Sequence, residues 1–171
     1  TVYDRSLENF ESFQSVEGLR AKWQVVGDGV LGLERGRGSD GSKSLGLAAG
    51  DRGAVETRIN FEQPQDWLSS TYDFRFLRFY LKAETASRIS SLSVACEDGD
   101  WGRQRAEIVY PGDLSALSEK WVQWDVDLQS FLRSNPTLRL DHIDSLSIGF
   151  QGIGRLLVDD VSVEYQAAEY Q

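Results

Sequence analysis

Polar side chains able to bind a polyhydroxylated ligand recur at every second position of several apolar segments. Between residues 77 and 82, for example, Arg78, Tyr80 and Lys82 alternate with leucine and phenylalanine. Planar guanidinium, amide and carboxylate groups form paired hydrogen bonds, which suit the neighbouring hydroxyls of a sugar. Alternate residues of a strand share one face, so we expect the ligand-binding residues to share one face of a sheet. The predicted set is Arg78, Tyr80, Glu97, Arg105, Glu107, Gln123, Asp125 and Gln151.

The same residues have two other interpretations. A water-facing sheet surface is polar in many antiparallel sheets, so the pattern also fits an ordinary solvated face. Glu97 and Glu107 fall on the same predicted face, and two carboxylates are the minimum for glycoside hydrolysis. The sequence contains no G-x-S-x-G elbow, nucleotide-binding loop or metal-hydrolase motif. We therefore expect a binding protein that is not an enzyme.

The segments that must position these residues are strands. Period-two alternation runs through residues 77–82, 92–97, 105–109, 122–126 and 146–151, and further strand-like runs are 7–11, 23–26, 30–33, 44–48, 55–61 and 156–165. Two short helical turns are expected at residues 112–120 and 127–133, the second with Asp127 as its N-cap. About eleven short strands without crossover helices predict an all-β chain folded as an antiparallel sandwich or barrel.

Length and charge limit the classes of protein that fit. The 171 residues suit one domain, and we assign residues 1–165 to a single module and 166–171 to a linker. The 18 Lys and Arg against 27 Asp and Glu give a net charge of −9, which repels phosphate backbones and anionic lipid. We therefore expect neither nucleic acid nor a membrane as partner. The chain has no Met and does not start with a signal peptide, which indicates a processed protein or a piece of a longer one.

Two residue types that often bind metals are nearly absent. Cys96 is the only cysteine and lies in an apolar run, so we expect a buried thiol that acts as a small hydrophobe. His142 is the only histidine, and without a second histidine or a cysteine pair nearby a zinc site is not expected.

Several short motifs follow one another in a recognisable order. They are residues 7–11 followed by Trp23, the loop 40–45, the segments 76–83 and 121–128, a turn at Ser130 and Phe131, and the closing residues 157–163. In this order and spacing, nearly the whole chain resembles the jelly-roll carbohydrate-binding modules of the galactose-binding-like superfamily. The resemblance implies a jelly-roll β-sandwich that binds a poly- or oligosaccharide without catalysis. It also implies a monomeric, extracellular or cell-surface module beside other domains of a larger protein.

The resemblance further implies a structural calcium ion that joins the first and last strands. It places carboxylate ligands at Glu11 and Asp160 and main-chain oxygen ligands in the loop 40–43, which ends at Lys43. Calcium binds six to eight hard oxygens, and a glycine-containing loop can turn its carbonyls inward. Asp159 in place of Asp160, and Glu8 as a weaker additional ligand, remain open. The alternative is that none of these carboxylates binds a metal.

Tryptophans are the usual stacking surfaces for sugar rings. Trp124 alternates in phase with valines and is predicted to be core, and Trp23 and Trp121 suit core or rim packing. Trp101, in a loop that follows the strand carrying Glu97, is the aromatic residue expected to overhang the ligand, with Trp67 as the lesser candidate. A flat row of aromatics is not evident, which favours a short or decorated chain bound in a cleft.

Two rival functions remain at this point. One is a structural or adhesion module without a sugar site, because proteins of one fold serve many functions. The other is a jelly-roll glycoside hydrolase or polysaccharide lyase, which the pair Glu97 and Glu107 keeps open.

Overall fold

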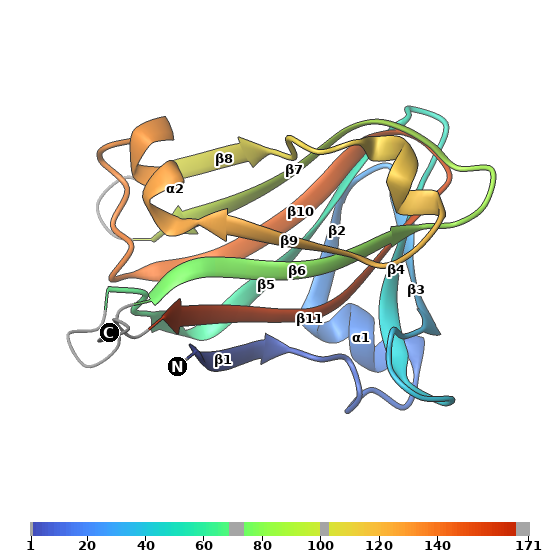
Figure 1. Ribbon diagram of the computed structural model, residues 1–171, viewed down its shortest axis with the longest axis horizontal. Coiled ribbons are helices and arrows are strands. Elements are labelled where there is room, and N and C mark those ends of the chain that lie inside the picture. The colour runs from blue at the N-terminus through green and yellow to red at the C-terminus, as the bar shows by residue number, and fades with distance from the viewer. Residues whose placement is uncertain (1, 69–73, 100–102, 167–171) are drawn as a thin grey trace, which may run out of the picture.

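The computed structural model describes residues 2–68, 74–99 and 103–166, and within them the chain forms two antiparallel sheets packed face to face (Figure 1). Sheet A has the strand order β3–β4–β11–β6–β9, and β1 pairs with β11 as well. Sheet B has the order β2–β5–β10–β7–β8. The predicted antiparallel sandwich of about eleven strands is therefore confirmed.

The strand bounds follow the predicted alternation closely. Sheet A contains β1 (Val2–Glu8), β3 (Gly29–Arg35), β4 (Lys43–Ala49), β6 (Phe74–Ala83), β9 (Val122–Asp127) and β11 (Arg155–Gln166). Sheet B contains β2 (Trp23–Gly27), β5 (Ala54–Gln65), β7 (Arg88–Asp98), β8 (Arg105–Val109) and β10 (Ile143–Ile153). Residues 167–171, most of the predicted linker, lie outside the described residues, whereas Gln166 still pairs with Val2.

Three short helical segments connect the strands. The two expected turns occur as η1 (Leu114–Ser118) and α2 (Leu128–Ser134), and Asp127 caps α2 by accepting a 2.9 Å hydrogen bond from the Gln129 N–H. The third, α1 (Val16–Lys22), was not expected from the sequence. Its Ser15 side chain caps the N-terminus, but only Leu19 of this helix is buried. A single buried residue leaves almost no helical periodicity to detect.

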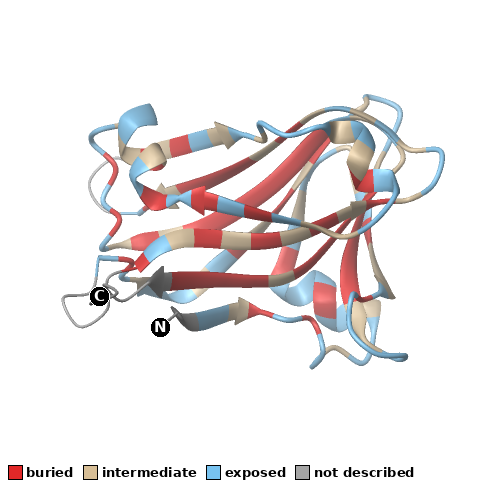
Figure 2. Ribbon diagram, viewed as in Figure 1, coloured by how far each residue is buried: buried red, intermediate tan, exposed pale blue. Residues whose placement is uncertain are grey.

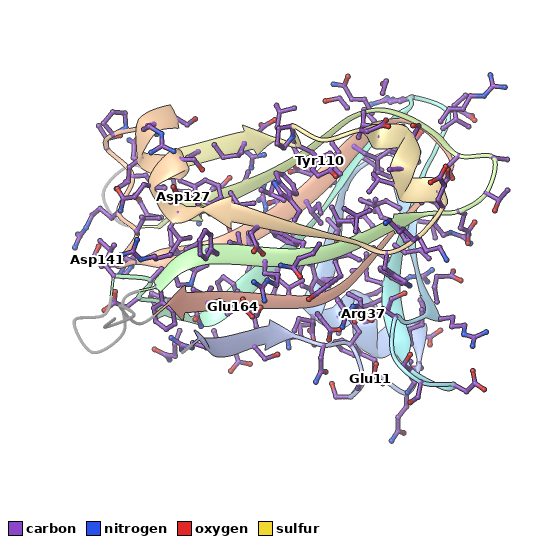
Figure 3. The ribbon with its side chains drawn as sticks, viewed as in Figure 1. Glu11, Arg37, Tyr110, Asp127, Asp141 and Glu164 are labelled. Atoms are coloured by element: carbon purple, nitrogen blue, oxygen red, sulfur yellow. The ribbon has the colours of Figure 1, made fainter. Side chains whose placement is uncertain are left out.

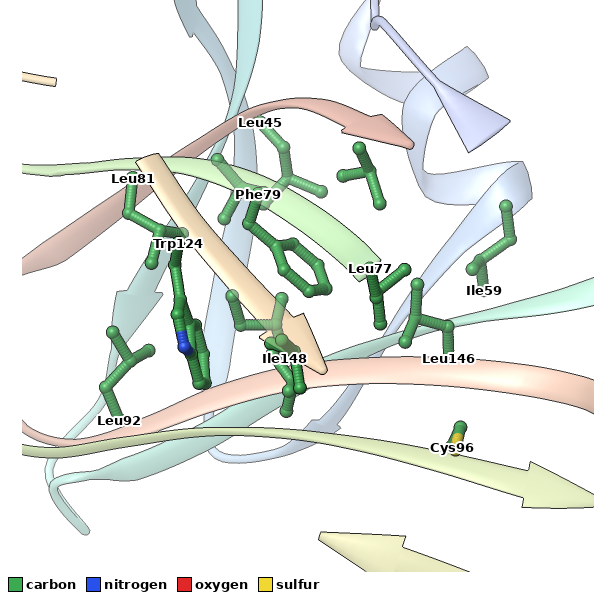
Figure 4. Packing of buried hydrophobic residues seen from close by; sticks show 14 of the residues in the cluster. Leu45, Ile59, Leu77, Phe79, Leu81, Leu92, Cys96, Trp124, Leu146 and Ile148 are labelled. Atoms are coloured by element: carbon green, nitrogen blue, oxygen red, sulfur yellow. The ribbon is translucent and has the colours of Figure 1, made fainter. Parts of the chain in front are cut away.

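The core lies between the two sheets and is filled by the apolar members of the alternating segments (Figures 2 and 4). Leu77, Phe79 and Leu81 of β6 face this core, as do Leu146 and Ile148 of β10. Because successive side chains of a strand point to opposite faces of its sheet, the residues between them face outward from the sandwich. The alternation in the sequence therefore identified the inward and outward side chains of these strands correctly.

Cysteine and tryptophan burial tests several expectations. Cys96 is fully buried, which raises the pKa of its thiol, and Trp124 is 6% exposed, so both belong to the core as predicted. Trp67 is also fully buried, so the prediction that its ring is a lesser candidate for sugar contact is wrong. Trp101 lies outside the described residues.

Over the part of the chain that is described, no helix has the length and apolar character needed to span a membrane.

Candidate functional site

The predicted ligand-binding residues fall on two opposite outer surfaces of the sandwich. Four of them, Arg78, Tyr80, Gln123 and Asp125, belong to β6 and β9 of sheet A. The others that the structure describes, Glu97, Arg105, Glu107 and Gln151, belong to β7, β8 and β10 of sheet B. The expectation of one shared face is therefore wrong. Alternation shows which side chains point outward, but pairing between distant strands decides which sheet carries them.

On sheet A the polar side chains are paired with one another. The Arg78 guanidinium binds both carboxylate oxygens of Asp125, at 2.6 and 3.0 Å, and also forms an ion pair with Glu164. Its hydrogen bonds to Asp125 raise the pKa of Arg78. The Tyr80 hydroxyl donates to the side-chain oxygen of Gln123 at 2.9 Å.

Arg37, labelled in Figure 3, comes from the loop before β4. Its guanidinium covers the ring of Tyr80 on this face. Its guanidinium lies 3.5 Å from the ring centroid and forms a 2.9 Å ion pair with Asp160. A sugar could stack on this side of Tyr80 only by displacing Arg37.

Sheet B presents a different surface because its outward residues line up in rows across the strands. One row runs Val26, Glu56, Gly149, Ser93 and Val109 from β2 to β8. The next row runs Gln24, Arg58, Ser147, Ala95 and Glu107. A third row runs Asn60, Ser145, Glu97 and Arg105. Across the three rows, five of the six side chains on β10 and β7 are small, Glu97 being the exception, and the polar side chains of Glu56, Arg58 and Asn60 stand on β5. On β8 the rows carry Val109, Glu107 and Arg105.

Small side chains thus form a strip along the middle of sheet B, with a hollow near either end of it, and we call this strip with its two hollows the groove. Its floor consists of Ser91, Ser93, Ala95, Ser145, Ser147 and Gly149. A Cβ on Gly149 would lie 2.6 Å from the Cβ of Glu56, so only glycine lets β5 approach the floor this closely. From Gln151 to Ser145 the groove runs about 20 Å, since a strand rises about 3.4 Å per residue.

Five charged side chains meet above this floor. Arg105 of β8 contacts Glu97 at 3.1 Å and reaches across two strands to Glu56 of β5 at 3.2 Å. Arg58 contacts Glu56 at 3.4 Å and Glu97 at 3.6 Å, and Glu107 lies 3.8 Å from Arg105. We call Glu56, Arg58, Glu97, Arg105 and Glu107 the ion-pair bridge. Small floor residues make it possible, because larger ones would keep the two walls apart.

Contacts with the carboxylates of the bridge favour the charged form of Arg105. Burial alone would lower the pKa of Arg105, but hydrogen bonds to Glu97 and Glu56 outweigh burial and raise it. Glu97 is the most enclosed member, with 14% of its side chain exposed. Glu56 and Arg58 were not among the predicted site residues, although the alternation in residues 55–61 already placed them outward.

Two hollows open beside the bridge, one on each side of it. One, of about 300 Å³, is lined by residues including Val26, Ala54, Ser91, Ser93 and Gln151. The other, of about 410 Å³, lies where β7 ends and β10 begins. The predicted site residues Glu107 and Gln151 line the first hollow, and Glu97 lines the second.

The residues expected to hold calcium lie where β11 passes from β4 to β1. The Glu11 carboxylate accepts a 2.8 Å hydrogen bond from the Lys43 N–H, and the Asp159 carboxylate accepts one of 3.0 Å from the Arg37 N–H. Asp159 is 2% exposed. Burial raises the pKa of Asp159 to about 6, and the charges of Asp160 and Glu11 act in the same direction.

Glu8 is in a different situation from these carboxylates. One of its oxygens accepts from the Trp23 indole at 3.0 Å and lies 3.0 Å from the Lys22 ammonium, and the other accepts from the Phe10 N–H. The Glu8 carboxylate is thus already neutralised by Lys22, whereas Asp159 is a buried carboxylate beside two more negative charges.

Comparison with known proteins shows the fold. No protein-family model and no curated protein matches the chain. Among solved structures, the family 11 carbohydrate-binding module of a cellulosomal cellulase of Clostridium thermocellum superposes with a TM-score of 0.69 at 16% identity, covering 100% of this chain and 99% of that one.

Two further solved structures are similar. A family 30 carbohydrate-binding module of another C. thermocellum cellulosomal cellulase gives a TM-score of 0.62 at 13% identity, covering 86% of this chain and 88% of that one. An exo-β-agarase gives 0.67 at 18% identity, covering 96% of this chain but 25% of the agarase. The chain therefore has the fold of carbohydrate-binding modules, and it spans about a quarter of the length of the agarase.

Proposed function

We propose that the chain is a non-catalytic carbohydrate-binding module and that the groove of sheet B binds a poly- or oligosaccharide. The observation that carries this proposal is the ion-pair bridge above a floor of small residues. It supplies two guanidinium and three carboxylate groups, fixed by their mutual contacts, in a groove with room beside them. Such planar groups form paired hydrogen bonds with neighbouring hydroxyls.

The contacts within the bridge leave capacity for a ligand. A guanidinium has five N–H donors and a carboxylate has about four acceptor positions, more than the contacts within the bridge use. Groups already held in place lose little conformational freedom when a sugar binds. Val26 and Ala54, beside the same hollow, offer apolar contact to the C–H surface of a sugar ring.

Charge favours a neutral glycan. The bridge carries three carboxylates against two guanidinium groups, and the whole chain carries a net charge of −9. A uronate or sulfated chain entering the groove would meet like charge.

The comparisons support a binding role over an enzymatic one. Two of the similar structures are carbohydrate-binding modules of cellulases, and the third is part of an agarase. Glu97 and Glu107, the pair that kept hydrolysis open, both contact Arg105. They are members of one ion-pair network and line two different hollows, whereas glycoside hydrolysis uses two carboxyl groups that flank the same bond. We also propose that the module is extracellular or on the cell surface. In this proposal it is monomeric and lies beside other domains of a larger protein.

We also propose that calcium binds beside Asp159. Burial raises the pKa of the Asp159 carboxyl, and the charges of Asp160 and Glu11 add to this effect. A divalent cation beside these carboxylates would favour the charged form of Asp159. Glu11, Asp159 or Asp160, and main-chain oxygens around Lys43 would hold the ion. Its contribution would be structural, because the site joins the loop before β4 to the last strand.

The experiment for the main proposal is a glycan array followed by calorimetric titration of the glycan that binds. Arg58→Ala should reduce the affinity at least tenfold, whereas Arg133→Ala, on the exposed side of α2, should leave it unchanged. An array without any bound glycan would favour the structural or adhesion module instead. Sugar release from the bound polysaccharide that disappears in Glu107→Gln would show an enzyme.

A further inference from the structure

The second hollow of sheet B lies at one end of the groove, beyond the ion-pair bridge. We call it the end pocket and define it by Asn60, Phe61, Pro64, Glu97, Asp144 and Ser145. The row Asn60, Ser145 and Glu97 continues the groove directly into it, since these residues pair across β5, β10 and β7. Its volume of about 410 Å³ falls in the range of small-molecule sites.

The floor of this pocket contains a buried hydroxyl without a partner. Ser145 is 3% exposed, and among the described residues its Oγ has no hydrogen-bond partner. By contrast, Ser147, two residues along the same strand, accepts a hydrogen bond from Arg58. Burying a hydroxyl without a partner destabilises the folded state. Such a group therefore indicates a position where a ligand supplies the missing hydrogen bond.

The walls combine the two kinds of surface that a sugar ring needs. Phe61 and Pro64 give an apolar side, and the Asn60 amide with the Asp144 carboxylate gives a polar side. Gly99 makes room for Asp144, because a Cβ at position 99 would fall 1.3 Å from its carboxylate oxygen. Asn60 is exposed and makes only a 3.4 Å hydrogen bond to Gln24. Because Asn60 pairs with Ser145 across β5 and β10, rotation of this loosely held side chain would change access to the floor of the pocket.

We propose that the end pocket binds one sugar unit of the glycan held in the groove, either a side branch or the end of the chain. This inference rests on the proposed carbohydrate-binding function and adds a separate subsite to it. In this subsite the Ser145 hydroxyl bonds the sugar, and the ring lies against Phe61.

The test compares Ser145→Ala with wild type and with the groove variant Arg58→Ala, by calorimetric titration and thermal unfolding. Ser145→Ala should weaken binding of the array-identified glycan about tenfold. It should leave Tm unchanged or raise it, because the unpaired buried hydroxyl is gone. Ser145→Thr keeps the hydroxyl but adds a methyl group to the pocket, and it should also weaken binding. Loss of binding with retained stability is the signature of a subsite residue.

Two ligand arms identify the sugar unit. One arm uses a branched polysaccharide and its linear counterpart, for example galactomannan and unbranched mannan if mannans bind. The other uses short oligosaccharides of the same backbone. If Ser145→Ala weakens binding of the branched polysaccharide but not of its linear counterpart, the end pocket holds a side branch. If it weakens binding of the short oligosaccharides selectively, the pocket holds a chain end. Wild-type affinity of Ser145→Ala in both arms overturns the subsite, provided that Arg58→Ala loses binding. If the wild type itself binds no glycan, the proposed function fails as well.

Discussion

Both outer faces of the sandwich carry polar side chains, but they differ in the size of the side chains that stand on their inner strands. On sheet A, Tyr80 and Arg78 occupy the inner strand β6, and the side chain of Arg37 lies on Tyr80. On sheet B, the central strands β10 and β7 carry serine, alanine and glycine, and the charged groups meet above them. The comparison shows that a polar face becomes a groove when its central strands carry small residues.

The largest expected effect separates the two faces directly. Arg105→Ala removes the only member of the bridge that contacts three of its carboxylates, so glycan affinity should fall about thirtyfold, or about 2 kcal/mol. Arg78→Ala, which removes the equivalent cation of sheet A, should leave affinity within about twofold. Calorimetric titration of both variants measures this contrast. The opposite ranking would move the site to sheet A.

The second prediction concerns the floor. Ser93→Leu adds three carbon atoms at the first hollow and should reduce affinity about tenfold, or about 1.4 kcal/mol, by occupying space that the ligand needs. Gln123→Leu adds a leucine to the outer face of sheet A and serves as the control. Thermal unfolding should show that both variants remain folded. Equal affinities in the two variants would mean that the groove holds no ligand.

How far the sequence predicts this molecule depends on whether the property is local. Alternation is local, and it correctly placed Leu77, Val94 and Ile148 in the core and their neighbours outside. Sheet membership is not local. Arg78 pairs with Asp125 and Ser162, 47 and 84 positions away, and no short pattern shows that β6 and β7 belong to different sheets. For this reason the predicted site combined residues from two faces.

Which of the two adjacent aspartates is buried was not predictable for a related reason. The sequence shows two adjacent aspartates but not the irregular pairing of β11 between Asp159 and Ser162, where Asp160 has a φ of 47°. That irregularity decides which aspartate is buried. Trp67 was similarly ambiguous, because its position after β5 looks like a loop although its ring is buried.

The third prediction concerns Asp159 of β11, in sheet A. The pKa of Asp159 is raised from 3.8 to about 6 in the folded state, so this group lowers the free energy of unfolding as pH rises through that interval. At pH 7 the destabilisation is fully present. Asp159→Asn should therefore raise Tm at pH 7 in excess EDTA. With calcium at a hundredfold excess over its dissociation constant, the wild type should gain about 2.7 kcal/mol, or roughly 5 to 10 °C, and the variant much less.

The wild type and Asp159→Asn are both stripped of metal beforehand. Melting curves in EDTA and in calcium then give the Tm of each protein in each condition. A reversal in the order of the two proteins between the conditions is the expected result. If calcium shifts neither melting curve, the metal proposal is wrong, and Asp159 is simply a buried carboxyl that destabilises the fold.

The smallest expected effect tests whether sheet A has a structural role only. Tyr80→Ala removes the ring under Arg37 and the hydrogen bond to Gln123. Exposed cation–π contacts and neutral hydrogen bonds each contribute about 1 kcal/mol or less, so Tm should fall by roughly 2 to 4 °C. Glycan affinity should not change, since Tyr80 lies on the face opposite the groove.

The partner variant makes this last result specific. Arg37→Ala should lower Tm by a similar amount, and the double variant by less than the sum, because both single variants remove the same contact. Affinity must stay at the wild-type value in all three. If Tyr80→Ala instead loses binding while Arg37→Ala gains it, the Tyr80 ring is a sugar platform that Arg37 covers. The roles of the two faces would then have to be exchanged.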